Sequence, residues 1–351
     1  MSPDVFLPHT LPLIQAPMAG CQDQGLAIAV SQAGALGSLP AALLDPAALE
    51  PCLQALQDSG RPYNVNFFAH RSSTPSPQQL QAWSERLAPW YAERGLGQVP
   101  MARPGRRAFD AASAEVLAGF RPSVVSFHFG LPEPALLRQV RSTGARVMAT
   151  ATSLDEALYL QSRGVDAVIA QGLEAGGHRG HFLNTDPAEQ APLERLLAQL
   201  LPRLSVPVIA AGGIATASQV ERLLAQGVAA VQVGTAFLLC DEARTSALHR
   251  RRLKTSEGDT VLTAALTGGL ARGLPNRISR EFAPLTDELP PFPWLTATLA
   301  PLREWAEARG LDDFTPLWCG TRHQALQEGP AEQIVRRLMG RLAAQEAPHA
   351  H

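Results

Sequence analysis

Short apolar runs of strand-forming residues alternate with helical patterns through the first 240 residues of this 351-residue chain. Runs that are apolar throughout are typical of strands buried on both faces of a parallel sheet. Eight runs have this character: Leu13–Ala16, Ala35–Leu39, Tyr63–Phe67, Val124–His128, Arg146–Ala149, Ala167–Ala170, Val208–Ala211 and Ala230–Val233.

Helical patterns separate nearly all of these runs. Several end just before a glycine, as a helix C-terminus should, at Gly60, Gly144, Gly164 and Gly227. The clearest are Pro46–Asp58, Ser76–Glu93, Glu133–Ser142, Leu154–Arg163, Pro192–Leu201 and Ala217–Gln226.

Eight strand–helix units predict an α/β protein with a closed, TIM-type parallel (β/α)8 barrel. A doubly wound open sheet is the alternative. It would normally use fewer units and place a G-x-G-x-x-G sequence after its first strand. Here the first strand runs into Ala16-Pro17-Met18-Ala19-Gly20, which favours the barrel.

The alternation stops near residue 240. The segment that follows is rich in Arg, Thr, Gly and Pro. We therefore expect a barrel over 1–240, a smaller and mainly helical cap domain over 241–313 inserted after the eighth strand, and a C-terminal segment over 314–351 that returns to the barrel.

Composition excludes several classes of function. The net charge is −2, and no basic run with interleaved aromatics occurs, so we expect no nucleic-acid partner. No window approaches 18 uninterrupted apolar residues and the first residues do not resemble a signal peptide, so we expect no membrane partner. Four scattered cysteines without a C-x-x-C pair indicate reduced thiols in a cytoplasmic protein.

Lys254 is the only lysine of the chain. It lies in the charged run HRRRLKTSEGD, which has the pattern of a solvated helix end. Schiff-base catalysis needs a desolvated lysine, so a barrel aldolase of that type is disfavoured. A Walker A phosphate loop is also excluded.

In a parallel barrel, functional groups gather at the C-terminal ends of the strands. Glycines follow the seventh strand at Gly212-Gly213 and the eighth at Gly234-Thr235. Such glycines let backbone N–H groups approach an anion, although tight turns alone would also explain them. Occurring together at both loops, they predict a phosphate site. The backbone of the glycine-rich loop Gly176-Gly177-His178 could lie close against the flat ring of a ligand. The alternative is that this loop is a flexible lid.

His128 ends the fourth strand between Phe127 and Phe129. A lone histidine is more often a satisfied structural residue. At a barrel mouth opposite a phosphate site, a general base is the better hypothesis. His178 and His181 should lie near the same mouth, but without Asp or Glu at ligand spacing we expect no metal site.

Taken together, these motifs resemble the class I nitronate monooxygenases, formerly called 2-nitropropane dioxygenases. The resemblance covers nearly the whole barrel and the closing segment. It is carried by LPLIQAPMAG, GALGSL, YNVNFF, SFHFG, GVDAVIAQGLEAGGHRG, PVIAAGGIA, VQVGTAFL and LWCGTRHQAL.

The resemblance implies an FMN cofactor, with the ring against Pro17 and Met18 and hydrogen bonds from Asn66 and Gln171. It implies that His128 is the catalytic base. The further residues of the implied cofactor site are Gly176, Gly177, His178, Gly212, Gly213, Gln232, Val233, Gly234 and Thr235.

The implied reaction oxidises small alkyl nitronates, such as propionate 3-nitronate, or nitroalkanes with O2, giving carbonyl compounds and nitrite. The alternative is an NAD(P)H-dependent FMN reductase of quinones or enoyl thioesters on the same barrel. A non-catalytic flavin or phosphate sensor is a third reading. The Phe-His-Phe-Gly motif favours the oxygenase. We expect a monomer or a weak homodimer.

Two segments depart from the family pattern. A Tyr-Pro segment of the relatives is Phe292-Pro293 here, and an Ala-Gly-Gln of the closing segment is Cys319-Gly320-Thr321. A hydroxyl and an amide are therefore lost, so the resemblance does not fix the substrate.

Overall fold

The computed structural model describes residues 7, 11–71, 73–184, 186–283, 288–340 and 342. Eight parallel strands form one sheet in the order β1-β9-β8-β6-β5-β4-β3-β2, and a parallel bridge between Ile14 and Leu36 joins its two ends. The sheet is thus a barrel. Its strands are β1 (Leu13–Gln15), β2 (Gly37–Pro40), β3 (Tyr63–Phe68), β4 (Val124–His128), β5 (Arg146–Ala151), β6 (Ala167–Gln171), β8 (Val208–Ala211) and β9 (Ala230–Val233).

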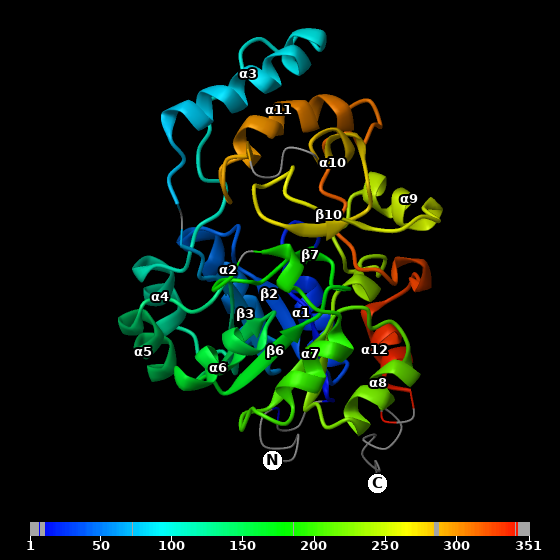
Figure 1. Ribbon diagram of the computed structural model, residues 1–351. Helices are drawn as coiled ribbons and strands as arrows, with labels where there is room; N and C mark the ends of the chain where they lie inside the picture. Colours follow the sequence, from blue (N-terminus) through cyan, green and yellow to red (C-terminus); the bar gives the residue numbers. More distant parts are fainter. Residues whose placement is uncertain are drawn as a thin grey trace.

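Helices surround the barrel (Figure 1). They are α1 (Gln24–Gln32), α2 (Pro46–Asp58), α4 (Ala111–Ala118), α5 (Pro134–Ser142), α6 (Leu154–Ser162), α7 (Leu193–Leu200), α8 (Ala217–Ala225) and α12 (Ala331–Met339). Side chains that accept an N–H of the first turn begin many of them, as Asp45, Asp110 and Ser153 do.

The barrel prediction is confirmed. Each of the eight predicted strands lies within two residues of an observed one. The six clearest helix ranges lie within one residue of α2, α3 (Pro77–Glu93), α5, α6, α7 and α8. Gly60, Gly144, Gly164 and Gly227 all have positive φ, as the C-terminal signal requires.

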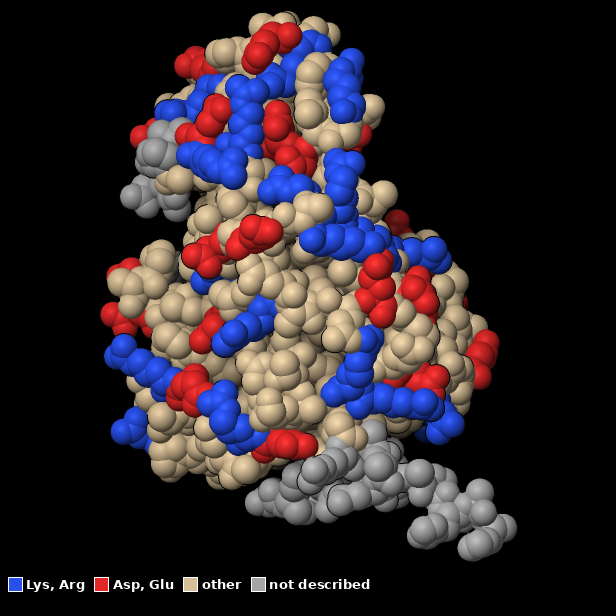
Figure 2. All heavy atoms as spheres, turned by 90° about the vertical axis from the view of Figure 1, so that its right-hand side faces the viewer, with Lys and Arg blue, Asp and Glu red and all other residues tan. Residues whose placement is uncertain are grey.

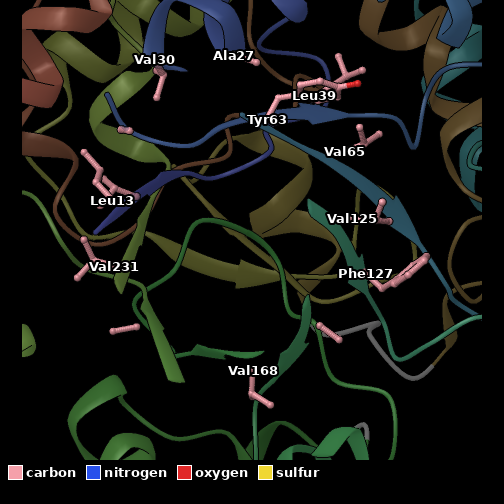
Figure 3. Packing of buried hydrophobic residues seen from close by; sticks show 14 of the residues in the cluster. Leu13, Ala27, Val30, Leu39, Tyr63, Val65, Val125, Phe127, Val168 and Val231 are labelled. Atoms are coloured by element: carbon pink, nitrogen blue, oxygen red, sulfur yellow. The ribbon is translucent and has the colours of Figure 1, made fainter. Parts of the chain in front are cut away.

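Both faces of the barrel strands are apolar because both are covered. Val65 and Val125, which are register partners on β3 and β4, belong to the core between the strands and the surrounding helices (Figure 3). The alternate positions point into the barrel, where Ile14, Met148 and Ile209 pack together without solvent contact.

A second layer lies above the C-terminal mouth of the barrel (Figure 1). It contains α9 (Ala247–Thr255), α10 (Arg277–Glu281), α11 (Thr296–Glu307) and two short strands, β10 (Val261–Thr263) and β11 (Ala271–Gly273). These strands form an antiparallel sheet with β7 (Gly177–His178), which comes from the glycine-rich loop after β6. The loop is therefore held by the cap.

Helix α3 leaves the barrel and packs on α11 in this upper layer (Figure 1). Trp83 donates to Thr298 Oγ1 at 2.9 Å and Tyr91 donates to the Thr298 carbonyl at 2.6 Å. The upper hydrophobic cluster therefore draws on residues from well before position 240. The division into 1–240, 241–313 and 314–351 stays a prediction.

The molecular surface carries charges of both signs. Figure 2 shows Lys and Arg side chains interspersed with Asp and Glu over one face of both layers. Lys254 lies exposed near the end of α9 and pairs with Glu328, as its sequence context predicted. Among the described residues, no helix is long and apolar enough to cross a membrane.

Gly37 permits the close contact of α1 with β2. A Cβ at this position would lie 1.9 Å from the carbonyl oxygen of Ala27. We expect Gly37→Ala to lower the free energy of unfolding by about 3 kcal/mol, at the upper end of overpacking effects. Gly119→Ala is the control, because a Cβ there would meet only Val116 O at 3.5 Å. Denaturant unfolding measures both, and equal stabilities of the two variants would contradict this packing.

Candidate functional site

A deep cavity opens at the C-terminal mouth of the barrel, beneath the cap. It encloses about 1410 Å³ when its solvent-open mouth is included. All of the residues predicted for the catalytic and cofactor site line it: Pro17, Met18, Asn66, His128, Gln171, Gly176, Gly177, His178, Gly212, Gly213, Gln232, Val233, Gly234 and Thr235. His181, which was also expected near this mouth, is not among the lining residues. Within the described chain, no Asp or Glu lines the cavity.

The turn that carries Pro17 and Met18 is held by a buried amide, Gln22. Its Oε1 accepts the Met18 N–H at 2.9 Å and the Gln15 side chain at 2.6 Å. Its Nε2 donates to the Ser38 carbonyl of β2 at 2.7 Å. Gln22 was not predicted, because one polar residue after a short strand gives no signal of such a network.

Asn66 lies inside β3, two residues before its end, and not at the mouth-side end of the strand. Because side chains alternate along a strand, Asn64, Asn66 and Phe68 share the inner face. Asn66 donates to Ser126 Oγ of β4 at 2.9 Å. Phe68, which was not predicted, also lines the cavity.

One end of the cavity is formed by the loops after β8 and β9. Within the described chain, the N–H groups of Gly213, Gly234 and Thr235 have no acceptor. Gln232 Oε1 is buried without a donor. Arg322 lines the same cavity and follows Gly320, whose N–H binds Thr235 Oγ1 at 2.9 Å. This end therefore offers unused donors and a cation.

Helix α8 contributes little to these free donors. Thr216 and Gln219 form a capping box that binds the N–H groups of these two residues, and the lining of the cavity on this segment ends at Ala215, before the helix begins. The donors come from the glycine loops themselves. Gly212 and Gly213 have φ of 119° and 67°, which glycine tolerates best.

Some of the glycines are required by the packing of the protein itself. A Cβ on Gly176 would lie 2.4 Å from the carbonyl carbon of Cys319, and one on Gly320 would lie 2.6 Å from Glu174 O. The closing segment therefore rests directly on the loop after β6. Glycine at these positions does not by itself indicate a ligand.

The ring of His128 is fixed on both sides. Its Nε2 lies 3.2 Å from the carbonyl oxygen of His178, and its Nδ1 lies 3.1 Å from Thr150 Oγ1. Since a carbonyl only accepts, Nε2 carries the proton and Nδ1 accepts from the threonine hydroxyl. Nδ1 is therefore the position that could take up a further proton.

Both mouth histidines are neutral at neutral pH. Burial lowers the pKa of His128 to about 4, although its bond to the His178 carbonyl acts the other way. Burial, then the charge of Arg106, lowers the pKa of His178 to about 3. The Nε2 of His178 is 2.9 Å from Thr267 Oγ1 of the cap.

An aromatic wall of Phe68, Phe129 and Phe292 stands beside these histidines. The ring of Phe129 lies 4.6 Å from His128 and 5.2 Å from Phe292. Phe129 has φ of 67°, an unusual value for a bulky residue, so the chain is strained next to His128. Phe292 also lies 5.2 Å from the His178 ring.

Arg179 anchors the loop after β6 from within. It has no solvent contact and donates to the carbonyls of Gln171 and Gly172 at 2.7 and 2.6 Å. The Gln171 side chain is bound in the same loop, donating to the His178 carbonyl at 2.9 Å and accepting from Gly180 N at 2.8 Å.

Further residues line the cavity that were not predicted from the sequence, among them Arg106, Thr150 and Trp318. Thr150 lies near the end of β5, so the strand-end rule could have found it. Arg106 lies in the connection between α3 and α4, where no local pattern marks it. Among the described residues, no group of three or more His, Cys, Asp or Glu could hold a metal ion.

Fold and cavity first define a class: a (β/α)8 protein with a ligand site at the C-terminal mouth, as in barrel enzymes. The family model described as nitronate monooxygenase matches residues 5–340. The chain therefore belongs to the nitronate monooxygenase family, a family of flavoenzymes, and is an oxidoreductase. This confirms the resemblance inferred from the sequence.

Individual relatives agree with this assignment. A nitronate monooxygenase of Pseudomonas aeruginosa is 38% identical, covering 94% of this chain and 96% of that protein. A probable nitronate monooxygenase of Bacillus subtilis is 32% identical, covering 96% of each. The solved structure of a nitroalkane oxidase from Streptomyces ansochromogenes is 35% identical, with a TM-score of 0.86 and 97% of each chain covered.

The structure of FabK from Thermotoga maritima, 24% identical, has a TM-score of 0.71 and covers 97% of this chain and 96% of that one. This likeness shows the shared fold alone.

Buried neutral histidines predict sensitivity to acid. Burial is the main cause that lowers the pKa of His70, His128 and His249 to about 4 each. Unfolded histidine has a pKa of about 6.5, so this stability is present above about pH 6.5 and is lost as the pH falls toward 4. The melting temperature should fall across this window.

Neither ring nitrogen of His70 has a hydrogen-bond partner. In His70→Leu the fall in melting temperature between about pH 7.5 and about pH 5 should therefore be smaller than in the wild type. Identical pH profiles of the two proteins would contradict the assignment of a buried neutral imidazole.

Proposed function

We propose that this chain binds one FMN without a covalent link in the mouth cavity and oxidises small alkyl nitronates with O2. The observation that carries the proposal is the arrangement of the cavity. Unused N–H donors lie at its glycine end, and His128 and Phe68 lie at the other, with Phe129 and Phe292 packed behind them. Family membership gives the reaction type: a nitronate and O2 yield a carbonyl compound and nitrite.

The residues present fit this cofactor. The free N–H groups of Gly213, Gly234 and Thr235 would hold a phosphate, with Arg322 beside them. Pro17 and Met18 would lie against the ring, and the unpaired Gln232 Oε1 would accept from a polar edge. Asn66 and Gln171 retain hydrogen-bonding capacity toward the cavity. Gly176, Gly177, Gly212 and Val233 line the remaining wall.

When bound, FMN supplies electron transfer between the nitronate and O2. The chain's own residues bind and orient the substrate. His128 would accept a proton from a neutral nitroalkane at Nδ1, after the Thr150 hydroxyl turns away. The carbonyl of His178 keeps the opposite nitrogen protonated and the ring in place.

The low pKa of His128 decides which substrate form is preferred. With a pKa of about 4, the imidazole is unprotonated at neutral pH but is a weak proton acceptor. Preformed nitronates need no proton removal, so they should be the better substrates. Phe68, Phe129 and Phe292 keep water away from the reacting carbon.

The cofactor and the reaction are tested together with purified holoprotein. Mass spectrometry of the released chromophore should give FMN and not FAD, since the chain has no Rossmann fingerprint for a second phosphate. Propionate 3-nitronate should reduce the flavin and consume oxygen far faster than NADH reduces it. Rapid anaerobic reduction by NADH would instead support a reductase on this barrel.

His128→Asn should keep fold and FMN, because the other flavin contacts come from separate strands. Turnover of a neutral nitroalkane should fall by about 100-fold or more, since the proton has lost its acceptor. Turnover of a preformed nitronate should fall much less. The measurement is steady-state oxygen consumption with both substrate forms.

His178→Asn is the matched control, and it should weaken flavin binding more than it alters the ratio between the two substrates. Equal loss on both substrates in His128→Asn, together with lower stability, would make His128 a structural residue.

The cytoplasmic location and the monomeric or weakly dimeric state stay predictions.

A further inference from the structure

Arg106 lies in the connection between α3 and α4 and lines the mouth cavity. Gly105, the residue before Arg106, contacts the cap through its backbone. The N–H of Gly105 donates to the carbonyl of Pro293 at 2.9 Å, and a Cβ on Gly105 would lie 2.9 Å from Thr296 Cβ. Arg106 is thereby fixed at the aromatic end of the cavity, next to Phe292.

The guanidinium of Arg106 has no carboxylate partner among the described residues. Its one hydrogen bond goes to the adjacent carbonyl of Gly105 at 2.8 Å. Its neighbour Arg107, in contrast, is exposed and pairs with Asp110. A partly buried cation without a counterion is unfavourable, and an anionic ligand would relieve this cost.

The two arginines that line the cavity, Arg106 and Arg322, come from different parts of its wall. Arg322 lines the cavity two residues after Gly320, whose N–H donates to Thr235 Oγ1 in the loop after β9. Arg106 belongs to the aromatic end, where its charge lowers the pKa of His178, whereas the charges acting on His128 come from Arg179 and His181. Gly105 bonds to Pro293, and the ring of the adjacent Phe292 lies 5.2 Å from the His178 ring, so the backbone before Arg106 is held on the His178 side of the cavity.

We propose that Arg106 binds a second anionic group of the substrate, a carboxylate on the tail remote from the nitronate carbon. Arg106 then selects nitronates with an acidic tail over uncharged alkyl nitronates. The inference rests on the proposed function, because it places the reacting carbon at His128. The tail then extends toward His178 and the cap.

The chemistry of this end favours a carboxylate at Arg106. Phe68, Phe129 and Phe292 offer no hydrogen bond, and the nearby histidines are neutral. A guanidinium binds a carboxylate through two parallel N–H···O bonds, and both bonds are stronger where water is excluded. No Asp or Glu of the described residues lines the cavity to compete for it.

The test compares propionate 3-nitronate with propyl 1-nitronate, which has the same number of carbons but no carboxylate. The wild type should favour the first in kcat/KM. In Arg106→Gln the KM for propionate 3-nitronate should rise by about 10- to 100-fold, as expected for loss of a charged hydrogen-bonding partner. The KM for propyl 1-nitronate and both kcat values should change little.

Arg107→Gln is the matched control, since it removes the same charge one residue away on the exposed side. It should leave both substrates unaffected. Arg106→Lys keeps the charge without the planar fork and should recover part of the lost affinity for propionate 3-nitronate. Flavin content and thermal unfolding check the fold, and Arg106→Lys replaces Arg106→Gln in the comparison if the latter loses its flavin.

A binding measurement gives a readout without turnover. Malonate, titrated into the oxidised holoprotein and followed by flavin absorbance, should bind about 10-fold or more weakly to Arg106→Gln than to the wild type or Arg107→Gln. Equal malonate affinities, or equal losses on both nitronates, would overturn the role of Arg106. If the wild type oxidised neither nitronate, the proposed function itself would fail.

Discussion

The carbonyl oxygen of His178 joins the three parts from which the site is built. It accepts from His128 Nε2 at the end of β4 and from the Gln171 side chain at the end of β6. The same residue lies in β7 and pairs with Ala271 of the cap strand β11. The tautomer of His128, the path of the glycine-rich loop and the position of the cap are thus fixed together, so none can shift without the others.

The electrostatics of the cavity follow from burial. Within the described chain, its lining contains no acidic residue, and its histidines lose their charge because they are desolvated. Arg106 and Arg322 keep theirs, since arginine does not deprotonate in proteins. Permanent positive charge is therefore confined to these two side chains, one with the glycine loops and one with the aromatic wall. Such a cavity is suited to ligands that carry an anion at each end.

Much of this could be predicted because the signals are local. Eight apolar runs predicted the barrel, the strand-end rule found His128 and the glycine loops, and the family resemblance added Gln171. The strands β7, β10 and β11 have two or three residues each, which is too short for any periodicity. The packing of α3 on α11 joins segments about 200 positions apart, and Arg106 owes its place to that packing.

The two departures from the family pattern, at Phe292 and at Cys319-Gly320-Thr321, have the same consequence for the site. Phe292 leaves the cap wall without a hydroxyl, and buried Cys319 adds no strong donor. Substrate orientation then depends on groups that come from elsewhere in the chain. His128 Nε2 bonds to the backbone carbonyl of His178, and the charge of Arg106 lowers the pKa of the His178 ring. The two attachment points proposed for His128 and Arg106 would fix both the position and the direction of a short substrate, which an apolar wall alone cannot do.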